Sequence, residues 1–262
     1  MAEAVFIDRG QSRFEATELA RGPWDPNAQH GGASAALLIR AFEQVPGGDG
    51  LSLARVTYEL LRPAPLGEVD LQVEVVRPGK RVQLLEGSLR TADGTEILRA
   101  RALRVQVAVL DGASGTDVAP PPPGPETGEE LPPTFTAPAS PTFFPGAIEI
   151  RFVSGAFGGG PATGWFRLKV PLVAGEEPSP LQRLAAAADF GNGISTVLHW
   201  DEHLFINPDL TLYLDREPAG EWICLDARTT IAPGGVGTAE SVLYDHRGRV
   251  GRAIQALLVA PR

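Results

Sequence analysis

The sequence lacks several features that define common functional classes. Its one cysteine, Cys224, rules out an internal disulfide and an all-cysteine metal site, and it fits a reducing compartment. There is no run of Lys and Arg and the net charge is −9, so we expect no nucleic-acid surface and no binding to anionic membranes. A transmembrane helix needs about 18 consecutive apolar residues, and none occur. The first residues, Met1–Val5, lack the basic start and apolar core of a signal peptide, so we expect a cytoplasmic protein.

What remains is enough for one large core or two small ones, because 43% of the 262 residues are hydrophobic. Ten of the 24 prolines fall between Pro120 and Pro145. A segment of that composition cannot bury a core and favours extended backbone. We therefore predict a first unit at residues 1–110, a linker at 111–144 and a second unit at 145–262.

The two predicted units carry a shared pattern. When Gly94 is aligned on Gly248, three further residues keep in step: Ala102 with Ala256, Leu103 with Leu257, and Val105 with Val259. A repeat of such long period indicates two copies of one domain. The same alignment sets Arg101 against Gln255, so we expect the copies to differ in chemistry and a site to survive in one of them.

Each unit is predicted to contain one buried helix followed by several long strands. Gly31–Phe42 is apolar nearly all round, which is typical of a buried helix. Ser179-Pro180-Leu181-Gln182 has the residues of a capping box and begins a helix that we expect to run through Asp189. The predicted strands are 53–60, 69–76, 81–90 and 96–109, then 148–153, 165–170, 209–214, 221–230, 237–244 and 250–259. One helix wrapped by an antiparallel sheet, twice, is an α+β double-hotdog arrangement.

Four short motifs, in this order, resemble the double-hotdog acyl-CoA thioesterases of the type II bacterial group. They are His30-Gly31-Gly32, Ala188-Asp189-Phe190, the segment 207–213 and the segment 254–259. The resemblance implies hydrolysis of acyl-CoA thioesters, with CoA entering as part of the substrate and with no metal or other cofactor. It also implies that Asp189 and Gln255 are catalytic, together with a residue at position 207. Asn207 departs there from the Ser or Thr of the family.

The residues themselves leave alternatives open. Asp189 follows four alanines on an apolar helix, and a carboxylate there is costly to bury without partners, so it is either a general base or a solvated cap. Gln255 lies in a strand whose mostly apolar residues indicate burial, and a buried amide needs hydrogen-bond partners. Asn207 precedes Pro208, which also suits a structural turn.

His30, Gly31 and Gly32 open the first helix. The N–H groups at a helix N-terminus bind oxyanions and phosphates, so we predict that these three residues bind substrate. The alternative is that the glycines only let a buried helix pack closely.

Two rival functions remain at this stage. Asp25-Pro26-Asn27-Ala28-Gln29-His30 is similar to part of the signature of (R)-specific enoyl-CoA hydratases, with Asp25 and His30 as the working pair. The second rival is a non-catalytic acyl-binding protein. In that case Asn207 would show that the catalytic site has been lost. For partners we expect an acyl-CoA substrate and a second copy of the chain, because open edge strands favour a dimer.

Overall fold

The computed structural model describes residues 4–108, 120–131 and 142–262. The first half contains β1 (Phe6–Gly10), β2 (Arg13–Ala16), η1 (Glu18–Ala20), α1 (Gly31–Gln44), β3 (Leu51–Leu60), β4 (Gly67–Arg77), β5 (Val82–Thr91) and β6 (Glu96–Gln106). The short elements η2 (Pro125–Thr127), β7 (Glu129–Glu130) and η4 (Phe143–Ala147) follow. The remainder contains β8 (Ile148–Ser154), β9 (Ala162–Leu168), α2 (Pro180–Ala188), α3 (Gly191–Ile194), β10 (His203–Ile206), β11 (Asp209–Leu214), β12 (Trp222–Ile231), β13 (Val236–Asp245) and β14 (Gly248–Pro261).

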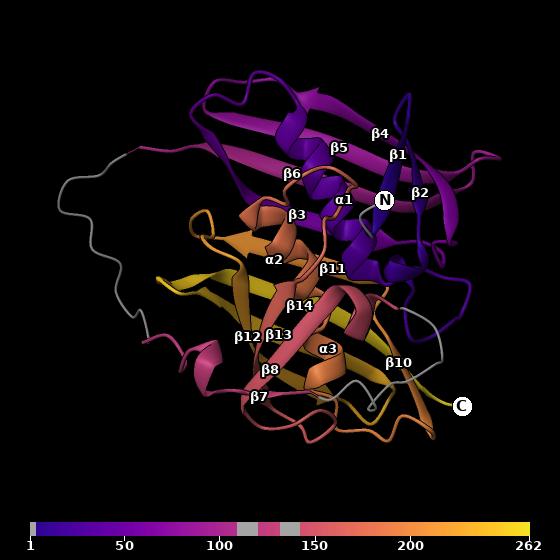
Figure 1. Ribbon diagram of the computed structural model, residues 1–262, viewed down its shortest axis with the longest axis vertical. Coiled ribbons are helices and arrows are strands. Elements are labelled where there is room, and N and C mark those ends of the chain that lie inside the picture. The colour runs from indigo at the N-terminus through magenta and orange to yellow at the C-terminus, as the bar shows by residue number, and fades with distance from the viewer. Residues whose placement is uncertain (1–3, 109–119, 132–141) are drawn as a thin grey trace.

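All the strands belong to one antiparallel sheet that curves around the helices. Its order is β1-β2-β4-β5-β6-β3-β11-β14-β13-β12-β9-β8-β7, with β10 paired to β14. Figure 1 shows α1 and α2 next to each other on one side of this sheet, and the two helices are in contact. No helix among the described residues is long and apolar enough to cross a membrane.

The sheet is built alike on either side of its centre. Read outward, the strands are β3-β6-β5-β4-β2-β1 on one side and β11-β14-β13-β12-β9-β8 on the other. At the centre Thr57 of β3 lies opposite Thr211 of β11, and the Thr211 hydroxyl lies 3.4 Å from that of Thr57. Thr57 and Thr211 are as many residues apart as Gly94 and Gly248. The pairing at the centre of the sheet therefore matches the repeat found in the sequence.

The helices follow the predicted pattern with one difference. α1 is buried along most of its length, as its apolar surface predicts, and α2 begins at the expected cap, where Ser179 Oγ accepts a hydrogen bond from Gln182 N–H. α2 ends at Ala188, however, and Asp189 lies at its C-cap. Phe190 N–H donates to Ala187 O, a tighter turn than the α-helical one, before α3 begins. Glycines 191 and 193 lower the helix propensity of this segment.

Part of the predicted linker takes part in the sheet. Residues 109–119 and 132–141 lie outside the described residues. Between them, β7 pairs with β8, and Trp165 Nε1 donates a 2.7 Å hydrogen bond to Pro123 O. β1 and β10 lie outside the predicted strands, because they are short and carry no clear alternation.

The alignment of Arg101 with Gln255 is wrong. Arg101 lies on the outer face of β6, where its Nε donates to Glu86 at 2.7 Å and its side chain is 58% exposed, whereas Gln255 is 1% exposed. Arg90 pairs with Glu96 in the first hairpin, but Tyr244 pairs with Arg249 in the second, so the first turn is one residue longer. When the alignment allows for this extra residue, Gln255 corresponds to Ala102, which is buried.

A buried carboxylate fixes the second of these turns, which leads into β14. Asp245 is fully buried and accepts two 2.6 Å hydrogen bonds from Arg216 and backbone N–H bonds from Ala219 and Arg247. Asp245→Asn removes the charge that Arg216 pairs with, so we expect the free energy of unfolding to fall by about 3 kcal/mol. Urea denaturation would measure the loss, and an unchanged midpoint would contradict this role.

Acid should weaken the same interaction. Burial by itself raises the pKa of Asp245, but Arg216 and the two N–H groups outweigh it, and the net pKa is lowered. A carboxyl whose pKa is lowered by folding stabilises the protein above its unfolded value and loses that contribution as the pH falls. The stability difference between wild type and Asp245→Asn should therefore shrink below about pH 4.

Candidate active site

Asp189 lies where the end of α2 meets the beginning of α1. The residues before it, 185–188, are all buried alanines, and small side chains let the two helices approach closely. Gly31 and Gly32 serve the same purpose on α1. A Cβ at Gly31 would lie 2.7 Å from Asp189 Oδ2, and one at Gly32 would lie 2.5 Å from the backbone oxygen of Ala186. Only glycine fits at these two positions without a shift of the neighbouring atoms.

Three separate parts of the chain supply hydrogen bonds to the Asp189 carboxylate: α1, β14 and the turn between β10 and β11. The Asp189 side chain is 8% exposed. Its Oδ1 accepts from Asn207 Nδ2 at 2.8 Å and from Gln255 Nε2 at 3.1 Å. Its Oδ2 accepts from the Gly32 N–H at 2.9 Å. The structure therefore brings together the three residues predicted as catalytic and the predicted glycine motif.

Gln255 is held in a single orientation. Its Oε1 accepts from the N–H of Asn192 at 3.0 Å, so its Nε2 faces Asp189. The Asn192 side chain is 4% exposed and donates to Phe205 O in β10 at 2.9 Å. Asn192 thus ties Gln255 to the strand that leads to Asn207. Asn192 is not among the residues predicted from the sequence, because it holds Gln255 through its backbone N–H.

Asn207 reaches Asp189 because the strand pairing with β14 is interrupted between β10 and β11. In this gap the Ala256 N–H donates to the Asp209 side chain at 2.6 Å instead of to a strand carbonyl. Burial raises the pKa of the Asp209 carboxyl, and the Ala256 hydrogen bond offsets part of that rise. Asn207 Nδ2 also donates to Asp209 O at 3.1 Å, so the same amide group binds both the turn backbone and Asp189.

His30 is the N-cap of α1, and its Nδ1 lies 3.1 Å from Asp189 Oδ2. Its ring stacks on Phe190 with a centroid distance of 4.4 Å and is tilted against Phe143 at 5.1 Å. The predicted Asp25–His30 pair of a hydratase is not formed. Asp25 is exposed, and its carboxylate accepts from the Asn27 N–H at 2.8 Å.

The corresponding place at the other end of the helix pair has different chemistry. Here Glu43, near the end of α1, accepts from Ser179 Oγ at 2.7 Å and from Gln182 Nε2 at 2.8 Å, both at the start of α2. Burial raises the pKa of Glu43, and those two hydrogen bonds offset part of the rise. Arg104 and Leu53 line an adjoining cavity of about 370 Å³. The carboxylates at the two ends of the helix pair therefore have different hydrogen-bond partners, so the arrangement around Asp189 is not repeated around Glu43.

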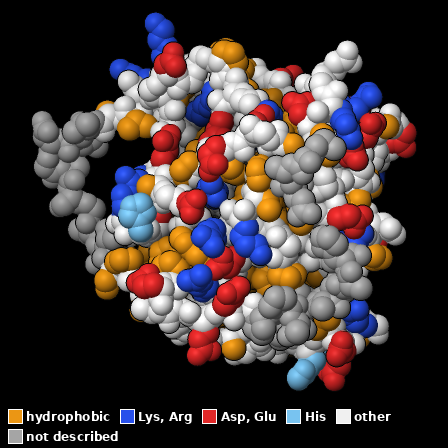
Figure 2. Space-filling model, viewed as in Figure 1, with side chains coloured by type: hydrophobic (Ala, Val, Ile, Leu, Met, Phe, Trp, Pro, Cys, Tyr) orange, Lys and Arg blue, Asp and Glu red, His pale blue; other side chains and the backbone are white. Residues whose placement is uncertain are grey.

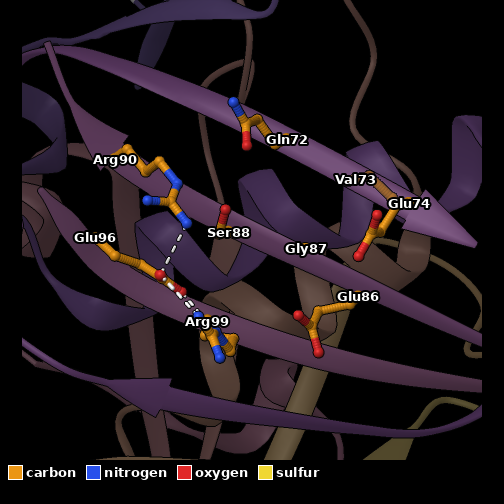
Figure 3. Close-up of a pocket in the computed structure, with 9 residues that line it drawn as sticks. All are labelled: Gln72, Val73, Glu74, Glu86, Gly87, Ser88, Arg90, Glu96 and Arg99. Atoms are coloured by element: carbon orange, nitrogen blue, oxygen red, sulfur yellow. Dashed lines mark hydrogen bonds and ion pairs between the residues drawn. The ribbon is translucent and has the colours of Figure 1, made fainter. Parts of the chain in front are cut away.

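A second depression, of about 290 Å³, lies on the outer surface of the first half (Figure 3). It is lined by β4, β5 and β6 on the face away from α1, and Figure 3 shows Arg90 and Arg99 converging on Glu96. Because these charges are already paired and lie across the sheet from Asp189, this depression is separate from the candidate site.

The surface carries charges of both signs. On the face shown in Figure 2, Lys and Arg side chains are interspersed with Asp and Glu. Arg151 and Arg167, for example, both bind Glu149. No cluster of three or more His, Cys, Asp or Glu suited to a metal ion occurs within residues 4–108, 120–131 and 142–262.

Two family models match the chain. Residues 20–105 match the family model of the acyl-CoA thioesterase N-terminal domain, and residues 117–259 match that of the acyl-CoA thioesterase C-terminal domain. No curated protein matched the chain.

Solved structures share the fold at low sequence identity. A Thermobifida fusca YX protein described as a thioesterase II is 20% identical, with a TM-score of 0.74, and the match covers 97% of this chain and 95% of that one. A thioesterase-like protein of Novosphingobium aromaticivorans DSM 12444 is 24% identical, with a TM-score of 0.70 and coverage of 98% and 99%. A conserved hotdog-fold protein of Alicyclobacillus acidocaldarius is 15% identical, with a TM-score of 0.73 and coverage of 97% and 95%. These likenesses show an α+β hotdog fold.

Proposed function

The chain belongs to the acyl-CoA thioesterase family and is a thioester hydrolase, and we propose that it hydrolyses acyl-CoA to a free acid and CoA at Asp189. One observation carries this proposal. A buried carboxylate meets Asn207, Gln255 and the N-terminus of a helix at a single point. A positioned carboxylate can act as a general base for the addition of water to a carbonyl group, and N–H groups at a helix N-terminus can bind the oxyanion that forms.

The attacking water binds at Oδ2 of Asp189 in this proposal. Oδ1 already accepts two hydrogen bonds, from Asn207 and Gln255, whereas Oδ2 accepts one from Gly32. Asn207 uses Nδ2 for Asp189 and Asp209, so its Oδ1 is the atom that can accept the second water proton. The two contacts together orient the water oxygen toward the thioester carbon.

The reaction then balances without a further reactant. The water O–H bond breaks as its oxygen attacks the carbonyl carbon, and Asp189 takes the proton. The C–S bond breaks next, and the sulfur of CoA takes that proton and leaves as a thiol. The N–H of Gly31, in the first turn of α1, is the donor that we propose for the oxyanion, because the N–H of Gly32 is engaged by Asp189.

We further propose that the chain is a tandem duplication, with hotdog units at 1–110 and 145–262. The strand order on either side of β3 and β11 supports this. The acyl group would lie between helix and sheet near Asp189, and the CoA phosphates near the surface. A cytoplasmic dimer joined through edge strands stays a prediction.

A panel of saturated acyl-CoAs of increasing chain length, assayed for thiol release, tests the proposed function. We expect release from at least one length. Addition of water to crotonyl-CoA without thiol release would instead identify a hydratase, and binding without turnover at every length would identify an acyl-binding protein.

Asn207 offers a graded test within the same assay. Asn207→Ala removes both the donor to Asp189 and the acceptor for water, so we expect kcat to fall by about tenfold or more. Asn207→Ser restores a hydroxyl, which can donate to Asp189 and accept from water, so it should keep or raise kcat. Equal activity of the Ala variant and wild type would exclude a role for this side chain.

A further inference from the structure

Three atoms at the start of α1 form a tight triangle. His30 Nδ1 lies 3.1 Å from Asp189 Oδ2, and the Gly32 N–H lies 3.0 Å from the first and 2.9 Å from the second. Both side chains are nearly buried, at 11% and 8% exposure. The imidazole is thus in hydrogen-bond reach of the proposed base, with little water to separate them.

In this triangle His30 Nδ1 and Asp189 Oδ2 are both acceptors, and the Gly32 N–H supplies the one proton that they share. The Gly32 N–H points at a lone pair of Nδ1 and a lone pair of Oδ2, and those two atoms face each other at a distance typical of a hydrogen bond. Two lone pairs at that distance repel. A proton placed between them turns the repulsion into a hydrogen bond, and low local polarity strengthens both effects.

We infer that His30 Nδ1 and Asp189 Oδ2 act as one joint acceptor for the proton of the attacking water. The inference rests on the proposed hydrolysis at Asp189. The water O–H bond breaks, its oxygen binds the carbonyl carbon, and the proton lodges between Nδ1 and Oδ2 until the CoA sulfur takes it. His30 is thereby a second catalytic residue, because its Nδ1 shares the transferred proton with Asp189.

Other charged groups do not compete for this proton. The side chains on η1, on the segment leading into α1 and on α2 have partners of their own: Arg21 with Glu18, Asp25 with the Asn27 N–H, and Arg183 with Glu177 and Leu168 O. The rings of Phe190 and Phe143 pack against the imidazole and carry no charge. Within the described residues, Asp189 is the charged partner that reaches His30.

The variant His30→Asn separates this role from helix capping. Asn is a preferred N-cap, so it can still accept from the Gly32 N–H, but an amide cannot share a proton with Asp189. Loss of the second acceptor weakens the base. We expect kcat to fall by about tenfold and the acid limb of the kcat/KM profile to move to lower pH.

Ser179→Ala is the matched control, because it removes the N-cap of α2 at the far end of the helix pair. It should lower the midpoint of urea denaturation, as the loss of a helix cap does, and leave the pH profile unchanged. A His30→Asn protein whose pH profile equals that of wild type would overturn the inference, even if Asp189→Asn is inactive and the proposed hydrolysis stands.

A second readout does not depend on activity. The chain has four histidines, so the imidazole nitrogen signals of His30 can be assigned by comparing ¹⁵N NMR spectra of wild type and His30→Asn. Asp189→Asn removes the carboxylate that faces Nδ1, so it should change the ¹⁵N signal of His30 Nδ1. An unchanged Nδ1 signal would show that the two side chains do not share a proton, whatever the fate of the hydrolysis.

Discussion

Replacing Asp189 by Asn is expected to lower kcat by about 10²–10⁴, the usual contribution of a positioned general base. Asn keeps the shape of the side chain and removes the charge that takes up the water proton. KM should change much less, because the ground state of a thioester has little use for that charge. Thiol release from the best acyl-CoA of the panel measures both constants.

Glu43→Gln is the matched control. Glu43 occupies the equivalent place at the opposite end of the helix pair, where it binds Ser179 and Gln182 instead of Asn207 and Gln255. It should keep the wild-type kcat. Wild-type turnover by Asp189→Asn would rule out the mechanism, and equal losses in the two variants would point to a general effect of charge on packing.

The second large loss of activity is expected when a single methyl group is added at Gly31. Gly31→Ala places a Cβ 2.7 Å from Asp189 Oδ2, well inside contact distance. The carboxylate must then shift, which disturbs its hydrogen bonds to Asn207 and Gln255. A displacement of about 1 Å in a catalytic group can cost about 10²-fold in rate, so we expect kcat/KM to fall by that order.

Gly193→Ala is the corresponding control, since a Cβ there has no neighbour within 4 Å. It lies in α3, three residues beyond Phe190, and should keep near-normal activity. Full activity of Gly31→Ala would mean that the carboxylate tolerates displacement. Urea denaturation of both variants separates a moved side chain from a loosened fold.

The sequence predicted those parts of the fold that depend on local patterns. α1 is recognisable because nearly all its side chains are apolar, and the start of α2 because Ser179 and Pro180 have the chemistry of a cap. β1 and β10 could not be predicted, since they are short and exist because neighbouring strands supply their hydrogen bonds. The pairing of β7 with β8 depends on tertiary contacts in the same way.

The candidate site was predictable to the level of residue type. A carboxylate on an apolar helix and an amide in a core strand both need partners, and they are partners to each other. The alignment could not show which side chains of β6 and β14 point toward the helices. One extra residue in the first hairpin turn reverses which side chains point inward, so Arg101 was matched to Gln255 in place of Ala102.

The roles of His30 and Asn192 required three-dimensional information. His30 is distant from Asp189 in the sequence, and their contact depends on the packing of α1 against α2. Asn192 acts partly through its backbone N–H, which has no signature in the side-chain pattern. Of the three residues predicted to bind substrate, His30 and the Gly32 N–H contact Asp189, which the sequence does not indicate. Substrate binding by the Gly31 N–H stays a prediction.

The central claim is that Asp189 directs a water molecule onto an acyl-CoA thioester. Its most direct test is a single turnover in H₂¹⁸O, with enzyme in excess over an acyl-CoA and the free acid analysed by mass spectrometry. Direct attack by water predicts one ¹⁸O in the acid and release of one CoA thiol. Release of an unlabelled acid in the first turnover would mean that an enzyme oxygen attacked the carbonyl, and absence of thiol release from every acyl-CoA would refute the hydrolysis itself.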